Sequence, residues 1–308
     1  LWPNAPTTTR SPDTGGIMAK TTVLADGIFF GEGPRWHGGK LWFSDFYETA
    51  VKTCTVDGKV TIEFSTPVRP SGLGWTPDGT LLVVQMQDRK VMKRGADGVL
   101  KDHADLSHLA AWYCNDMVVD AAGRAYVGNF GFNLEEAFHT RPIEDIIANH
   151  PTANLMIVEP DGSTRVGSPD MHFPNGSVIT PDGKTLIVGE TFGFVLTAFD
   201  IAADGSLSNR RVWAPLGNRP PDGICLDADG QIWVANPLAH EVFRVKEGGE
   251  VTEVVETTQP CFACMLGGDD GKTLFALTAA SSEETIAGGS RTGKIETFRA
   301  SSPRAGRP

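Results

Sequence analysis

The sequence predicts an all-β fold, a six-bladed β-propeller of four-stranded antiparallel blades with a metal site on its central axis. The chain has 35 Gly and 20 Pro among 308 residues, which favours a globular protein with many tight turns. Short runs rich in β-branched and aromatic residues also recur along the chain, and such runs are typical of strands. The six runs are LWFSDF, TLLVVQM, RAYVGNF, KTLIVGE, QIWVANP and KTLFALT.

Each run belongs to a unit with the same internal order. A unit opens with a turn marked by Gly or Pro, continues as an apolar strand, turns again, and enters one of the six runs. Ten Asp-Gly dipeptides, which favour hairpin turns, punctuate these units. A period of about 40 to 50 residues with four strands per unit is typical of a propeller. A β-sandwich is the alternative, but it does not explain the same order recurring six times. The openings begin at Gly31, Pro70, Cys114, Pro174, Pro221 and Phe262.

Two segments complete the predicted architecture. The strand 21–24 (TTVL) is expected to pair with 294–298 (KIETF) and so close the ring. Residues 133–149 read as a helical insertion in the third blade, either a lid over the channel or a surface excursion. The predicted organisation is a disordered extension or vector-derived remnant over residues 1–20, one propeller over 21–300 and a tail over 301–308.

Charge and cysteine content limit the expected partners and the expected cellular compartment. A net charge of −11 argues against a general nucleic-acid binder and against adhesion to anionic membranes, so neither is an expected partner. No run is long and apolar enough for a membrane span. Five scattered cysteines do not form a disulfide framework, which predicts a reducing cytoplasm. Cys261 and Cys264 have redox or zinc spacing, but without a second pair we expect two small buried side chains.

One aligned position carries the chemistry. Blades repeat around an axis, so side chains at one position of every unit should converge there. Of the six side chains at this position, those of Glu32 and Asp222 present carboxylate oxygens and those of Asn115 and Asn175 present amide oxygens. Burying the two carboxylates together requires a cation. All-oxygen ligation favours Ca²⁺, with Mg²⁺ or Mn²⁺ as alternatives; without His or Cys the case for Zn²⁺ is weaker. The alternative is that Asn and Asp merely form turns here. The six residues are Glu32, Ser71, Asn115, Asn175, Asp222 and Ala263.

Three further polar residues lie at the ends of the six runs. Asp45, Glu190 and Asn236 could add to the metal site, but alternation along a strand does not fix the face on which they lie.

The openings resemble a known family. Gly31-Glu32-Gly33-Pro34, Asn115-Asp116, Pro174-Asn175-Gly176 and Pro221-Asp222-Gly223 are similar, as an ordered set, to the SMP-30/gluconolactonase/luciferin-regenerating-enzyme family. The resemblance covers about residues 25–298. It implies a six-bladed propeller with one catalytic divalent cation, and a lactonase activity that many members share. It also implies that Glu32, Asn175 and Asp222 bind the metal, that Asn115 reaches the metal or the substrate, and that Asp222 accepts and donates the proton.

One departure bears on the substrate. The family's sugar-lactone hydrolases carry an arginine two residues before the asparagine of the third unit, where this chain has Tyr113. This favours a less polar lactone or ester. Further aromatic residues at strand ends or beside the column are expected to add to the pocket rim, or else to fill the wedges between blades, namely Phe46, Tyr47, Phe194 and Phe262. His172, three residues before Asn175, is a candidate pocket residue, with an ordinary surface histidine as the alternative. The predicted substrate-binding residues are Asn115, Tyr113, Phe130, Phe132, Met86, Phe192 and His172.

The predicted reaction is metal-assisted hydrolysis of a small-molecule lactone, with Asp222 moving the proton. No G-x-S-x-G elbow argues for a covalent intermediate. Two alternatives remain. One is a calcium-dependent organophosphate hydrolase, which the same four residues also resemble. The other is a propeller whose ion only holds the blades together and whose face binds a partner. The sequence does not indicate an oligomeric state.

Overall fold

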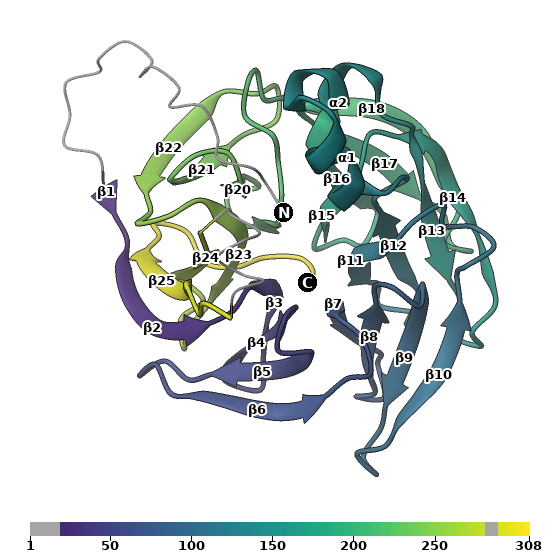
Figure 1. Cartoon of the computed structure of the whole chain (residues 1–308), viewed down its shortest axis with the longest axis horizontal. Helices are drawn as coiled ribbons and strands as arrows, with labels where there is room; N and C mark the ends of the chain where they lie inside the picture. Colours follow the sequence, from purple (N-terminus) through teal and green to yellow (C-terminus); the bar gives the residue numbers. More distant parts are fainter. Residues whose placement is uncertain (1–18, 281–288) are drawn as a thin grey trace.

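The computed structural model describes residues 19–280 and 289–308, which form six antiparallel sheets around a central axis (Figure 1). The predicted six-bladed propeller is confirmed. Blade 1 comprises β3 (Gly31–His37), β4 (Lys40–Asp45), β5 (Ala50–Cys54) and β6 (Val60–Ser65). Blade 2 comprises β7 (Pro70–Trp75), β8 (Leu81–Gln85), β9 (Lys90–Arg94) and β10 (Leu100–Asp105). Blade 3 comprises β11 (Cys114–Val119), β12 (Ala125–Asn129), β13 (Ala153–Val158) and β14 (Thr164–Met171).

Blades 4 to 6 close the ring. Blade 4 comprises β15 (Pro174–Ile179), β16 (Thr185–Glu190), β17 (Val195–Ile201) and β18 (Leu207–Pro215); blade 5 comprises β19 (Ile224–Leu226), β20 (Ile232–Asn236), β21 (Glu241–Val245), β22 (Val251–Glu256) and β1 (Ala19–Lys20); and blade 6 comprises β23 (Cys261–Gly267), β24 (Thr273–Thr278), β25 (Gly293–Arg299) and β2 (Thr22–Ile28). The pairing of β2 with β25, which sets Thr22 opposite Thr297, confirms the predicted closure. The short strand β1 runs parallel to β22 as a fifth strand, so the prediction of an extension over 1–20 is wrong for its last two residues. Residues 1–18 of that prediction lie outside the described residues.

Most Asp-Gly dipeptides make the hairpin turns that the sequence predicts. At Asp161-Gly162, for example, the glycine has a φ of 88°, which side chains other than glycine rarely adopt. The carboxylate of Asp161 accepts a hydrogen bond from the backbone N–H of Ser163 at 2.9 Å, which fixes the turn. Asp26-Gly27 lies instead within β2, and Asp222-Gly223 directly precedes β19.

The unit openings were predicted as turns, and this is wrong for most of them. In five units they are the first residues of the innermost strands β3, β7, β11, β15 and β23. Neighbouring innermost strands come so close near the axis that a Cβ at Gly176 would lie 2.5 Å from the backbone N of Ile224. A Cβ at Gly72 would lie 2.4 Å from the backbone N of Met117. Close packing between blades therefore requires glycine after Asn175 and Ser71. Turn formation, the alternative considered for the column, does not explain Asn175-Gly176.

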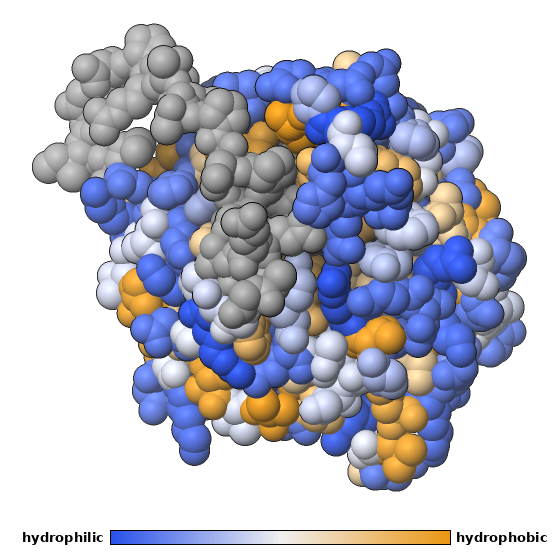
Figure 2. Space-filling model, in the orientation of Figure 1, coloured by the Kyte–Doolittle hydropathy of each residue, from blue (hydrophilic) through white to orange (hydrophobic). Residues whose placement is uncertain are grey.

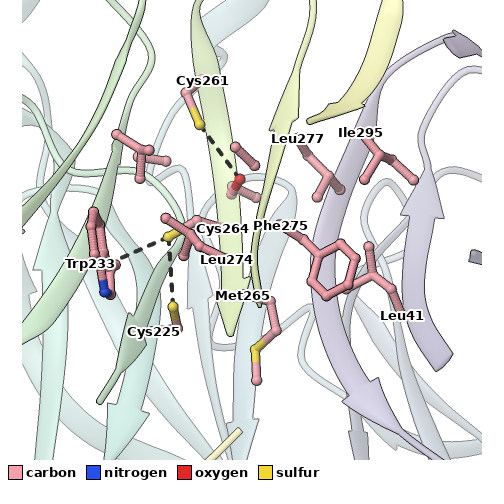
Figure 3. Close-up of a cluster of buried hydrophobic side chains, with 14 of the residues drawn as sticks. Leu41, Cys225, Trp233, Cys261, Cys264, Met265, Leu274, Phe275, Leu277 and Ile295 are labelled. Atoms are coloured by element: carbon pink, nitrogen blue, oxygen red, sulfur yellow. Dashed lines mark hydrogen bonds between the residues drawn. The ribbon is translucent and has the colours of Figure 1, made fainter. Parts of the chain in front are cut away.

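Apolar side chains fill the wedges between blades. Figure 3 shows the cluster between blades 5, 6 and 1, where Trp233, Phe275, Leu41 and Ile295 pack together. All five cysteines are buried and free. The Cys264 thiol donates to the carbonyl oxygen of Trp233 at 3.5 Å and lies 3.9 Å from the sulfur of Cys225. The expectation that Cys261 and Cys264 are buried packing residues is confirmed.

The insertion in blade 3 contains two short helices, α1 (Leu134–Thr140) and α2 (Ile143–Asn149), between β12 and β13. The Asn133 side chain caps α1 by accepting from the backbone N–H of Glu136 at 3.1 Å. Leu134, Ala137 and Ile146 are buried against a cluster of aromatic residues at one end of the propeller. A 3₁₀ turn (Thr191–Gly193) adds to the same end.

The face of the molecule in Figure 2 is mostly hydrophilic, with separate hydrophobic areas between the hydrophilic ones. Within the described ranges, no helix has the length and apolar character that crossing a membrane requires.

Candidate active site

The predicted column converges at one end of the central channel. Glu32 of blade 1, Asn115 of blade 3, Asn175 of blade 4 and Asp222 of blade 5 line one cavity of about 20 Å³. Asn115, Asn175 and Asp222 are buried, and Glu32 is partly buried. The cavity has room for about one water molecule or one small ion.

Hydrogen bonds within and between blades hold these side chains. The Ser71 hydroxyl donates to Oδ1 of Asn115 at 3.2 Å. Nδ2 of Asn175 donates to the hydroxyl of Thr191 at 3.1 Å, and that hydroxyl donates to the carbonyl oxygen of Pro221 at 2.8 Å. The hydrogen bond from Thr191 to Pro221 joins blade 4 to the segment that carries Asp222. The packing of neighbouring blades therefore positions the site.

The two carboxylates strongly influence each other. Desolvation raises the pKa of Glu32 well above its ordinary value, and the charges of Asp222 and Asp116 add to this effect. Desolvation also raises the pKa of Asp222, although a hydrogen bond from Asn175 opposes the rise. Both groups are thus acids whose charged forms are poorly stabilised by the protein alone.

Arg35 is the nearest strong cation, but it is committed elsewhere. Its guanidinium lies 2.6 Å from the carboxylate of Asp116, and both side chains are buried. The same group donates to the backbone carbonyl of Leu73 at 2.8 Å and to that of Met117. Arg35 therefore ties together the innermost strands of blades 1, 2 and 3, and neutralises the carboxylate of Asp116.

This donor set suits a hard divalent cation. Two carboxylates and two amides surround a cavity of ionic size, and the lining contains no Lys, Arg or His. A cation would compensate the charges that burial disfavours. In residues 19–280 and 289–308, there is no group of three or more His, Cys, Asp and Glu that could hold a metal. The axial site has only two residues of these types, because its other two donors are asparagines.

The rest of the cavity wall is apolar and crosses several blades. The rings of Phe30 and Phe262 have centroids 4.6 Å apart, and those of Phe130 and Phe173 lie 4.8 Å apart, edge to face. Phe173 has a φ of 60°, an uncommon conformation for a bulky residue and one that often marks functional sites. The apolar lining consists of Phe30, Phe46, Phe130, Phe173, Phe262 and Leu134 of α1.

Residues 30–280 match the model of the SMP-30/Gluconolactonase/LRE-like region. The chain belongs to this family. The resemblance predicted from the unit openings is confirmed.

Curated members of the SMP-30/gluconolactonase family align at low identity. Regucalcin from Oryctolagus cuniculus is 26% identical over 275 residues, covering 83% of this chain and 85% of the relative. Pentonolactonase XacC from Haloferax volcanii is 26% identical over 288 residues, covering 88% and 89%. The alignment with Regucalcin from Danio rerio, 28% identical, spans about half of each protein, 54% of this chain and 54% of the relative.

Solved structures share the fold. A calcium-binding protein, regucalcin, from Agrobacterium tumefaciens superposes with a TM-score of 0.74 at 22% identity, covering 94% of this chain and 95% of the other. A gluconolactonase from Xanthomonas campestris gives a TM-score of 0.71 at 23% identity, covering 91% and 89%.

In this family member, the predicted substrate-binding residues lie at different distances from the cavity. Asn115 and Phe130 line it. Met86 and Phe192 belong to the surrounding aromatic cluster, with Phe132 and Tyr113 packed partly buried against it. Tyr113 stacks on Trp112, with ring centroids 4.9 Å apart. His172 does not line the axial cavity: its Nδ1 pairs with Nε2 of His150 at 2.9 Å, beside a different pocket.

The three residues that could have added to the metal site do not do so. Asp45 lies 2.8 Å from the buried ammonium of Lys52. Glu190 accepts from Arg210 at 3.2 Å, and Asn236 donates to Glu241 at 2.9 Å. Each side chain is turned toward the outer strands of its own blade, where a basic or polar partner satisfies it.

Three lining residues were missed by the sequence analysis, namely Phe30, Phe173 and Leu134. A signal existed for two of them. Phe30 and Phe173 each lie two residues before a column residue, Glu32 and Asn175, and this is the position that Tyr113 holds before Asn115. Leu134 belongs to the inserted helices, which have no counterpart in the other units.

Proposed function

We propose that this protein is a divalent-metal-dependent hydrolase that opens a lactone less polar than a sugar lactone. The observation that carries the proposal is the cavity itself, where four oxygen-bearing side chains from four blades meet a wall of five phenylalanines. The names of two relatives, a pentonolactonase and a gluconolactonase, support hydrolysis of a lactone.

Glu32, Asn115, Asn175 and Asp222 would hold the cation, and Ca²⁺ is the first choice because all four donors are oxygens. Relatives named regucalcin, one of them described as a calcium-binding protein, support the same choice. When bound, the cation supplies Lewis-acid polarisation of a carbonyl oxygen and lowers the pKa of water.

The protein's own residues supply the proton chemistry and the positioning. Asp222 accepts the proton of the attacking water as the water oxygen bonds to the carbonyl carbon. The ring C–O bond then breaks, and Asp222 returns the proton to the leaving alkoxide, so the product is a hydroxy acid.

The walls determine the substrate class. Phe30, Phe130 and Phe173 can contact apolar ring substituents, whereas no cationic side chain lines the cavity to bind sugar hydroxyls. A cavity of about 20 Å³ does not hold a lactone ring, so side chains of this wall must move when the substrate enters. Leu134 of α1 is part of this wall, so we propose that the insertion takes part in admitting the substrate.

A substrate panel tests this function. Alkyl- and aryl-substituted lactones should be hydrolysed with higher kcat/KM than glucono-δ-lactone, and chelation should lower the rate about a hundredfold or more, reversibly on adding Ca²⁺. The measurement is pH-stat hydrolysis with metal analysis of the same preparation. Faster cleavage of an aryl phosphotriester would support the organophosphate hydrolase instead. A tightly bound ion without turnover of any substrate would indicate a structural ion.

The gain in thermal stability on adding Ca²⁺ should depend on pH. The folded-state pKa values of Glu32 and Asp222 are raised, so without a cation their contribution to stability falls as the pH rises from the unfolded values of about 4 through the folded ones. A cation replaces the lost protons. Added Ca²⁺ should therefore raise Tm more at about pH 8 than at about pH 5. Differential scanning calorimetry measures this, and an equal gain at both pH values would contradict a site made from these carboxylates.

A further inference from the structure

A second cavity lies at the opposite end of the central channel. Its volume is about 330 Å³, within the range of small-molecule sites. The innermost strands run from the axial site to this cavity: β3 begins near Glu32 and ends at His37, five residues at about 3.3 Å each, or about 17 Å away. Its side-chain lining includes Arg35, Trp36, His37, Trp75, Arg304 and Arg307.

The C-terminal segment 300–308 forms one wall of this cavity. Its backbone bonds to three blades in turn: Arg304 N–H donates to Gly271 at 2.9 Å, Ala305 N–H to Leu226 at 3.0 Å, and Arg307 N–H to Ile179 at 2.9 Å. Figure 1 shows the segment reaching the middle of the ring, where the C mark lies. The backbone fixes Arg304 and Arg307 in place, so their side chains are not needed to hold the segment.

The two guanidinium groups lack acidic partners. Among the described residues, neither Arg304 nor Arg307 forms an ion pair, although the chain carries an excess of carboxylates. Within the described part of the chain, the guanidinium of Arg304 donates only at 3.4 Å, to the carbonyl oxygens of Trp36 and Pro308, and the guanidinium of Arg307 only at 3.4 Å, to that of Val119. A guanidinium has five N–H donors in a planar fork. Arg304 is exposed and Arg307 is half-buried, so most of these donors face the solvent of the cavity and can reach a ligand there.

The surroundings show the effect of this unbalanced positive charge. Desolvation lowers the pKa of Arg304. Desolvation and the charge of Arg304 together lower the pKa of His37. Arg35, the third guanidinium of the lining, is already neutralised by Asp116 at 2.6 Å. The cavity is therefore a positively charged site in an acidic protein, which attracts anions.

Flat rings form the wall beside the arginines. His37 and Trp75 stack with ring centroids 4.0 Å apart and planes within 5°. Next to the two charged groups they offer a surface for the apolar or aromatic part of an organic anion.

We propose that this cavity is an anion-binding site that takes a small molecule bearing a carboxylate or phosphate group, with the oxyanion on Arg304 and Arg307 and its remainder against His37 and Trp75. Paired N–H groups of arginine match the two oxygens of either oxyanion. The site is separate from the axial cavity, so its occupation does not depend on the proposed hydrolase activity.

Calorimetric titration with two probes, benzoate and inorganic phosphate, tests the site. We expect saturable binding of at least one probe at millimolar or lower concentration, with tighter binding of benzoate indicating a carboxylate ligand and tighter binding of phosphate indicating a phosphate ligand. Arg304→Gln and Arg307→Gln should each weaken binding about tenfold, since a charge-assisted hydrogen bond is lost.

The matched control is Arg299→Gln, which makes the same charge change on the exposed partner of Asp270. It should leave binding unchanged. Far-UV circular dichroism and Tm establish that each variant is folded. Absence of saturable binding of both probes to the unmodified protein would overturn the proposal. Equal affinity in the Arg304→Gln/Arg307→Gln double variant and in Arg299→Gln would also overturn it. Lactone hydrolysis is measured separately, so failure of one proposal leaves the other standing.

Discussion

Asp222→Asn should lower kcat for lactone hydrolysis by about a thousandfold, because the amide cannot accept the proton of the attacking water. Asparagine keeps the size of the side chain and one oxygen that can accept from Asn175, so the fold should survive. Loss of one carboxylate should also weaken Ca²⁺ binding, since the remaining donors carry only the charge of Glu32. The measurements are pH-stat rates at saturating Ca²⁺ and calcium titration by calorimetry.

The control for this substitution is Asp200→Asn. Asp200 is an exposed residue of β17 that pairs with Arg211 at 2.7 Å, so the same chemical change there should leave both rate and affinity unchanged. If Asp222→Asn retains full activity at saturating Ca²⁺, Asp222 is not the proton acceptor. If it loses activity but the rate returns at high Ca²⁺ concentration, the residue acts only as a ligand.

The blade architecture could be predicted because its signals are local. An Asp-Gly turn such as Asp161-Gly162 specifies its own geometry, and a repeat multiplies that signal six times. The site column could be predicted for the same reason, since Glu32, Asn115, Asn175 and Asp222 share one position in the repeat.

What the repeat does not encode was harder to predict. Whether Asp45 faces the axis or the outer strands depends on Lys52, a partner on the next strand. Leu134 reaches the cavity from an insertion that occurs in one blade only. Phe30 and Phe173 were predictable in principle, because the position of Tyr113 in the repeat pointed to them.

Asp116 shows how a departure from the repeat can carry structure. Four other units have glycine after the column residue, at Gly33, Gly72, Gly176 and Gly223, where innermost strands approach closely. The third unit has Asp116 there, and the cost of this buried carboxylate is offset by Arg35. The sequence shows the exception, but only the structure shows that its partner, Arg35, comes from blade 1.

Arg35→Met should lower the free energy of unfolding by about 3–5 kcal/mol, because it leaves the buried carboxylate of Asp116 without its partner. That carboxylate already acts on Glu32 and Asp222, so its charge would then add to theirs without the guanidinium that offsets it. Adding Asp116→Gly removes the stranded charge and restores the glycine of the other units. The double variant should therefore recover much of the loss.

The control variant is Arg211→Met, which breaks the solvent-accessible ion pair with Asp200. It should lower the free energy of unfolding by about 1 kcal/mol or less, so its difference from Arg35→Met shows the effect of burial. Thermal unfolding followed by calorimetry, at one pH and with saturating Ca²⁺, ranks the variants. Equal Tm values for Arg35→Met and Arg211→Met would mean that water or rearrangement satisfies Asp116. In that case the bonds of Arg35 from blade 1 to blades 2 and 3 would not hold the channel together, and the geometry of the axial site would depend on the glycine packing alone.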